Sequence, residues 1–166
     1  VSENQRIMYN VIMDIDSKYF KERPNFDEYF FDIARAVSKR SEDVFIQHGA
    51  VIVDENNHIV GTGYNGFVKG FDFLKMEVNP YDRNQRRPYM IHAEQNAILN
   101  SVTRPSHSTI YITGEPCVQC LLSMVNFGVK NIIYIDGVGS ITDNDSTREI
   151  KRKIVKGSGV NFMSAT

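Results

Sequence analysis

The chain has 166 residues, of which 42% are hydrophobic and 23% are charged, and its formal net charge is -1. This length and apolar content suit one folded domain with a sizeable core and argue against a disordered chain. The near-neutral charge predicts no nucleic-acid partner, and the apolar runs are too short for a membrane span.

The first part of the chain predicts two helices followed by a hairpin. Residues 1–23 are expected to form an N-terminal helical extension that ends at Pro24, because proline removes a backbone donor. From Phe26 the apolar residues follow the i, i+3, i+4 spacing of an amphipathic helix. Gly49–Val53 and Ile59–Thr62 are strand-like segments on either side of polar turn residues, which indicates a hairpin.

The rest of the chain predicts an alternation of helices and strands. Residues 66–88 show few periodic signals and are expected to form a long irregular loop of the kind that often carries function. The remaining predicted helices are residues 91–101, 117–127 and 146–156, and the remaining predicted strands are residues 109–113, 131–135 and 160–163. This order favours the α/β class, as a three-layer α/β/α sandwich with a central mixed five-stranded sheet in one domain, residues 1–166.

Cys117 and Cys120 are the two cysteines of the chain, and they lie too close together to close a useful disulfide loop. The sequence shows no secretory signal and no membrane span, so a reducing, cytoplasmic location is expected. In that setting a C-x-x-C pair is either a redox pair or half of a metal site.

His92 and Glu94 decide between these alternatives. The segments around His92 and around the cysteines each lie at the start of a predicted helix, where backbone N–H groups and the helix dipole favour thiolates. Cys117 and Cys120 can direct both sulfurs at one ion, and His92 supplies a nitrogen ligand. Three protein ligands with an open fourth position are typical of catalytic zinc, here one ion per chain. Glu94 would lie beside the open position and transfer protons.

The other readings of the cysteine pair lack support in the sequence. A thioredoxin-like redox pair would need no His-x-Glu partner, and a structural zinc site would need a fourth Cys or His. The remaining histidines, His48, His58 and His107, lie at a strand start, in a turn and in a loop, and are predicted to be surface or packing residues.

Four segments match the pattern of a known family: Gly49–Val53, Gly61–Gly66, His92–Asn100 and Tyr111–Cys117. On these segments the chain resembles the zinc-dependent cytidine deaminase-like superfamily, and within it the deoxycytidylate (dCMP) deaminases. The resemblance extends from about residue 27 to residue 163. It implies the cytidine deaminase-like fold, zinc held by the histidine and both cysteines, and proton transfer by the glutamate of the His-x-Glu motif.

The resemblance also assigns substrate contacts. Asn65 would hydrogen-bond the sugar or the base, and the backbone of Ala93 would meet the pyrimidine carbonyl. The carbonyl groups around Glu115 and Pro116 would accept from the leaving amine, and Tyr134 would line the nucleotide end of the site. From the residues alone, Asn65 can equally be a turn former and Tyr134 a core residue with a satisfied hydroxyl.

The activity implied by the resemblance is hydrolytic deamination of dCMP to dUMP and ammonia, which feeds thymidylate synthesis, with dCTP as a further candidate substrate. The family also suggests a homo-oligomer, typically a hexamer, regulated allosterically by dCTP and dTTP, with Mg²⁺ accompanying a triphosphate effector. Two alternatives remain at this point. One is another enzyme of the superfamily, acting on free cytidine or tRNA adenosine, and the other is a catalytically inactive zinc-binding module.

The phosphate contact departs from the family pattern. Residues 42–47 lack the basic residue that some relatives place there, and Val44, Phe45 and Ile46 are apolar instead. The candidate substitutes are Lys39, Arg40, Lys75, Arg83, Arg86 and Arg87. A charged loop is usually only a solvated surface, so the sequence does not choose among them.

Overall fold

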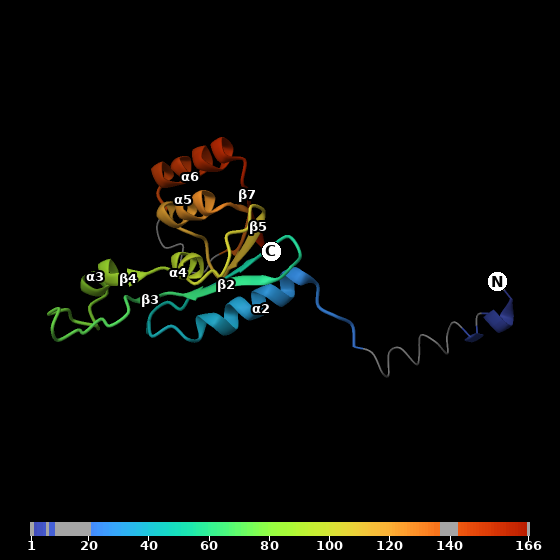
Figure 1. The fold of residues 1–166 in the computed structure, drawn as a ribbon, viewed down its shortest axis with the longest axis horizontal. Coiled ribbons are helices and arrows are strands. Elements are labelled where there is room, and N and C mark those ends of the chain that lie inside the picture. Colours follow the sequence, from blue (N-terminus) through green and yellow to red (C-terminus); the bar gives the residue numbers. More distant parts are fainter. Residues whose placement is uncertain (1, 6, 9–20, 137–142, 166) are drawn as a thin grey trace.

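The computed structural model describes residues 2–5, 7–8, 21–136 and 143–165, and its central sheet has the strand order β2-β1-β5-β6-β7 (Figure 1). The strands are β1 (Gly49–Val53), β2 (Ile59–Tyr64), β5 (Ser108–Ile112), β6 (Val129–Ile135) and β7 (Asn161–Ala165). β1 is antiparallel to both β2 and β5, whereas β5, β6 and β7 are mutually parallel. The predicted mixed five-stranded sheet is therefore confirmed.

Helices cover both faces of this sheet. One face carries α4 (Ala93–Leu99), α5 (Val118–Phe127) and α6 (Asp145–Ser158), and the other carries α2 (Phe26–Ser38) (Figure 1). Side chains of β1 point alternately to the two faces of the sheet and contribute to a hydrophobic core on each. Ala50 and Ile52 pack toward α4 and α5, while Val51 and Val53 pack toward α2. The predicted three-layer α/β/α sandwich is confirmed.

Glycine lets α4 lie directly on β2. A Cβ atom built on Gly63 would come 2.1 Å from the backbone nitrogen of Ala97, so no side chain fits between strand and helix. The side chain of Asn96 donates a 2.8 Å hydrogen bond to the carbonyl of Tyr64, which ties the same helix to the end of the strand. The start of α4 is thus held at a fixed distance from the sheet.

An arm projects from the sheet between β2 and α4, and we use this name for residues 66–91 (Figure 1). It contains β3 (Gly66–Phe67), α3 (Arg83–Arg86), a 3₁₀ turn (Arg87–Tyr89) and β4 (Met90–Ile91). The expectation of an irregular loop is wrong for these short elements. Two-residue strands and a four-residue helix are too short to show periodicity, and α3 depends on Asp82, whose side chain accepts from the N–H of Asn84.

Part of the predicted N-terminal extension lies outside the described residues, namely residues 1, 6 and 9–20. Its helical character over its full length therefore stays a prediction. Within the described ranges, no helix is both long enough and apolar enough to cross a membrane.

Candidate active site

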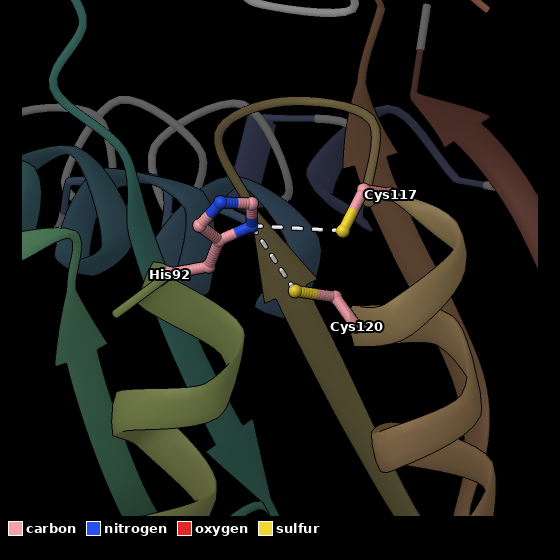
Figure 2. A group of neighbouring side chains, drawn as sticks. All are labelled: His92, Cys117 and Cys120. Atoms are coloured by element: carbon pink, nitrogen blue, oxygen red, sulfur yellow. Dashed lines mark hydrogen bonds between the residues drawn. The ribbon is translucent and has the colours of Figure 1, made fainter. Parts of the chain in front are cut away.

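Two helix starts bring the predicted zinc ligands together. His92 is the N-cap of α4, Cys117 is the N-cap of α5, and Cys120 lies in the first turn of α5. His92 Nδ1 lies 3.6 Å from Cys117 Sγ and 3.3 Å from Cys120 Sγ, and both cysteines are free thiols (Figure 2). The three side chains converge on one point between the helices.

The geometry of this group fits a zinc ion. The three donor atoms all lie within 4.8 Å of one another. In a tetrahedral site with Zn–N of about 2.0–2.1 Å and Zn–S of about 2.3 Å, a nitrogen and a sulfur ligand lie about 3.5 Å apart. The observed separations match that value, so the three side chains can hold zinc with a small adjustment, and three donors leave a fourth position open.

Hydrogen bonds inside the group already favour a thiolate. The thiol of Cys120, with help from His92, lowers the pKa of Cys117 to about 3. The same hydrogen bond, together with burial, raises the pKa of Cys120. The hydrogen bond with Cys117 also raises the pKa of His92, against the effect of burial. A thiolate is the form of cysteine that binds metal, so the group is prepared for a cation.

Glu94 is buried in the first turn of α4 and lines the same cavity as His92 and Cys117. Burial raises the pKa of Glu94 above its usual value. A carboxyl group with a raised pKa in a cleft is suited to accept and return a proton near neutral pH. The structure thus brings the predicted proton carrier to the predicted metal site.

The cavity has a volume of about 380 Å³, within the usual range for small-molecule sites. Two groups of lining residues carry most of its charged side chains. The arginine end consists of Asp43, Phe45, Arg83, Arg86 and Arg87, and the lysine end consists of Glu115, Asp143 and Lys151. His92 and Glu94 line the same cavity, so a bound molecule can meet all of these groups.

Asn65 and His48 form a connected pair in the cavity lining. The Asn65 amide accepts a 2.7 Å hydrogen bond from the N–H of His48 and donates a 2.8 Å bond to the carbonyl of Ile46. The ring of His48 lies 3.3 Å from the Thr113 hydroxyl, which itself accepts from the N–H of Gly49. Burial, then the nearby His92, lowers the pKa of His48.

The remaining predicted substrate contacts occupy different positions. Ala93 and Glu115 line the cavity, whereas Pro116 is fully buried and is outside the lining formed by the described residues. The ring of Tyr134 packs on Phe162 with centroids 4.8 Å apart, and Tyr134 is outside the lining formed by the described residues. Contact of Tyr134 with a nucleotide stays a prediction.

Sequence reasoning missed three charged residues of the cavity. Lys151 is 5% exposed and pairs with Glu115 at 2.9 Å and with Asp143, and Asp43 pairs with Arg86. No local signal marks Lys151, because its partner Glu115 lies 36 positions earlier in the chain.

Of the six candidate phosphate ligands, three line the cavity. These are Arg83, Arg86 and Arg87, whereas Lys39, Arg40 and Lys75 are outside the lining formed by the described residues. All three arginines lie within α3 or the 3₁₀ turn that follows it. The arm therefore supplies all three arginines of the cavity lining.

Comparison with known proteins agrees with this arrangement. The sequence profile of the cytidine and deoxycytidylate deaminase zinc-binding region matches residues 24–136. The chain belongs to this family. It is therefore an enzyme of the deaminase class, and the zinc-binding character of its His/Cys/Cys group agrees with the family.

The relatives include deoxycytidylate deaminases of animals. A probable deoxycytidylate deaminase of Drosophila melanogaster is 34% identical over 145 residues, which cover 81% of this chain and 70% of the relative. The deoxycytidylate deaminase of Mus musculus is 32% identical over 157 residues, which cover 92% of this chain and 86% of the relative. The resemblance predicted from the sequence is confirmed.

A solved structure shows the same fold. The dCMP deaminase of cyanophage S-TIM5, in complex with dCMP and dUMP, superposes with a TM-score of 0.66 at 24% sequence identity. The match covers 87% of this chain and all of the phage chain.

Proposed function

We propose that the chain catalyses the hydrolytic deamination of dCMP to dUMP and ammonia, and so serves thymidylate synthesis. The observation that carries this proposal is the convergence of His92, Cys117 and Cys120 beside the buried carboxyl of Glu94 in one cavity. The substrate follows from the relatives, which are named deoxycytidylate deaminases.

In this mechanism the protein binds, orients and moves protons. His92, Cys117 and Cys120 would hold zinc, which when bound lowers the pKa of a water molecule and so supplies the nucleophile. Glu94 takes one proton from the attacking water and delivers it to N3 of the cytosine, then takes the second proton from the new C4 hydroxyl group and delivers it to the departing amine. The C4–N bond breaks as the C4–O bond is completed, so water and dCMP yield dUMP and ammonia.

Three of the five proposed contact residues, Asn65, Ala93 and Glu115, belong to the cavity lining. The Ala93 N–H would meet the pyrimidine carbonyl, and the carbonyls at Glu115 and Pro116 would accept from the leaving amine. Asn65 has used one lone pair and one N–H on the backbone around His48, so one of each remains for the sugar or the base. Tyr134 would lie at the nucleotide end.

Several finer properties are part of the same proposal. They are a hexameric assembly, allosteric control by dCTP and dTTP, Mg²⁺ bound with a triphosphate effector, turnover of dCTP, and a cytoplasmic location. Each rests on the family resemblance, and size-exclusion chromatography together with kinetics in the presence of each nucleotide tests the assembly and the control.

The alternatives are less well supported by the molecule. A tRNA adenosine deaminase would need a more basic surface than a chain with a net charge of -1 provides. A free cytidine deaminase would need no arginines in its cavity, and an inactive zinc-binding module would have no use for a buried glutamate beside the metal site.

The test measures ammonia release from dCMP, dCTP, cytidine and cytosine, with and without a zinc chelator. We expect turnover of dCMP that the chelator abolishes. Glu94→Gln should retain zinc but lower kcat by about 10²–10⁴-fold, the usual contribution of a positioned acid-base group. Turnover of cytidine alone would contradict the assigned substrate.

A matched control is Glu55→Gln, since Glu55 lies exposed in the turn between β1 and β2. This variant should keep both zinc and full activity. Wild-type activity in Glu94→Gln would overturn the proton-transfer role, whereas loss of zinc from that variant would assign Glu94 to the metal site itself.

A further inference from the structure

Two arginines of the arm line the cavity and have no acidic partner among the residues that the structure describes. Arg83 and Arg87 lie four positions apart, and the backbone N–H of Arg87 donates to the carbonyl of Arg83. Residues at this spacing are neighbours on one helical face, where like charges repel each other. Both side chains contribute to the cavity lining. The arm therefore presents two adjacent positive charges to the same space as Glu94.

Arg86, in the same helical segment, is held by residues of another loop. Its side chain is 3% exposed, and its Nη2 donates a 2.8 Å hydrogen bond to Asp43 Oδ1. The guanidinium also lies 4.4 Å from the ring centroid of Phe45. A buried ion pair supported by a cation–π contact is a rigid attachment, so α3 is anchored to the loop that precedes β1.

The nearby carboxylates are already engaged. Asp82 accepts from backbone N–H groups of α3, and Asp43 accepts from the N–H of Phe45 as well as from Arg86. Among the residues that the structure describes, neither Arg83 nor Arg87 forms an ion pair with a carboxylate. Their charges are therefore available to an anionic ligand.

The lysine end cannot serve an anion in the same way. The Lys151 ammonium lies between Glu115, at 2.9 Å, and Asp143, so one positive charge faces two negative ones. At the arginine end, by contrast, three arginines face one aspartate. A ligand with a negatively charged group is therefore attracted to the arginine end and repelled by the lysine end.

We propose that Arg83 and Arg87 bind the 5′-phosphate of the nucleotide substrate, with Arg86 as the residue that positions both. This inference rests on the proposed function, because it assigns the phosphate of that substrate. Guanidinium groups suit a phosphate because their N–H donors form paired, charge-assisted hydrogen bonds with its oxygens. The arm thereby makes the enzyme prefer nucleotides over free nucleosides.

The test compares dCMP with deoxycytidine in the zinc-loaded enzyme. Arg83→Ala and Arg87→Ala should each lower kcat/KM for dCMP by about ten- to a hundredfold, as expected when a charge-assisted hydrogen bond is removed. The same variants should leave kcat/KM for deoxycytidine unchanged. Arg87→Lys should recover part of the loss, because it keeps the charge but not the paired donors.

The control variant is Lys75→Ala, an exposed cation of the same arm outside the cavity lining. It should leave both substrates unaffected. An equal loss for dCMP and deoxycytidine in Arg83→Ala and Arg87→Ala, or no loss for dCMP in the double variant, would overturn the phosphate assignment.

A binding measurement separates this inference from the proposed function. Calorimetric titration of dUMP and deoxyuridine should show tighter binding of dUMP to the wild type, and the double variant should lose that preference. If the wild type binds dUMP in this way but does not deaminate dCMP, the proposed reaction fails and the phosphate site stands. Equal affinities for dUMP and deoxyuridine in the wild type would overturn the phosphate site.

Discussion

The arginine end and the lysine end of the cavity use buried ion pairs in opposite ways. At the arginine end, the side chains of Arg86 and Asp43 are only 3% and 8% exposed to solvent. One positive charge there is paired with one negative charge. At the lysine end, Lys151 is similarly buried, but its partners Glu115 and Asp143 are 20% and 19% exposed. The first pair is sealed, whereas the second remains in contact with water.

This difference has consequences for stability and for ligand choice. A sealed pair depends fully on its partner, because an unpaired charge in the interior has no solvent to stabilise it. A partly hydrated group can relax, since water compensates for a lost partner. The Arg86–Asp43 pair therefore attaches α3 to the loop before β1, whereas the lysine end carries more negative than positive charge.

Breaking the sealed pair should give the largest effect. Asp43→Asn leaves the Arg86 guanidinium buried without a counter-charge and weakens the acceptor for the N–H of Phe45. We expect the free energy of unfolding to fall by about 3–5 kcal/mol, measured by urea denaturation. The double variant Asp43→Asn/Arg86→Met removes both charges and should cost less than Asp43→Asn alone. A loss below about 1 kcal/mol in the single variant would show that water reaches this pair.

Breaking the hydrated group should cost less. Lys151→Met leaves Glu115 and Asp143 unpaired, but both retain contact with solvent. The expected loss of unfolding free energy is about 1–3 kcal/mol in the same denaturation assay. The exposed Lys153→Met, two residues further along α6, serves as the matched control and should change stability little. A loss for Lys151→Met equal to that for Asp43→Asn would remove the distinction between the two ends.

The smallest effect concerns pH, and it has opposite signs at the two ends. Burial opposes ionisation of Asp43, but the N–H of Phe45 and the Arg86 guanidinium outweigh it and lower the pKa of that carboxyl. Its contribution is present above the ordinary pKa of about 3.9 and is lost as the pH falls through the lowered value. The thermal midpoint of Asp43→Asn should accordingly depend less on acid pH than that of the wild type.

For Lys151 the direction is reversed. Burial opposes its charge, but the carboxylates of Asp143 and Glu115 raise the pKa of the ammonium. This stabilisation is present below the ordinary pKa of about 10.4 and is lost as the pH rises through the raised value. The midpoint of Lys151→Met should therefore depend less on alkaline pH. Parallel acid and alkaline profiles for the two variants would contradict the assignment.

The fold was largely predictable because its elements carry local signals. β1 is a continuous apolar run, α2 has a regular apolar face, and Gly128 ends α5 in the left-handed conformation that glycine favours. β2 extends two residues beyond the predicted end at Thr62. The predicted strand stops there because Gly63 and Tyr64 do not continue the apolar pattern. The short elements of the arm were not predictable, since their pairing depends on contacts across the chain.

The metal site was predictable for a related reason. His92, Cys117 and Cys120 occupy helix starts, and both their spacing and their chemistry are visible in the sequence. The ion pairs were not, because Arg86 and Asp43 are 43 positions apart. Lys151 lies among other basic residues of α6, so in the sequence it resembles a residue of a solvent-exposed helix face.

Gly63 has a consequence for the metal that reaches beyond strand packing. The strand contributes no ligand, yet the absence of a side chain at this position sets how closely α4 approaches the sheet. α4 carries one donor, His92, while α5 carries the other two, so the dimensions of the coordination sphere depend on the spacing between β2 and α4. The position of the single donor on α4 relative to the two donors on α5 is thus set in part by the backbone of the sheet.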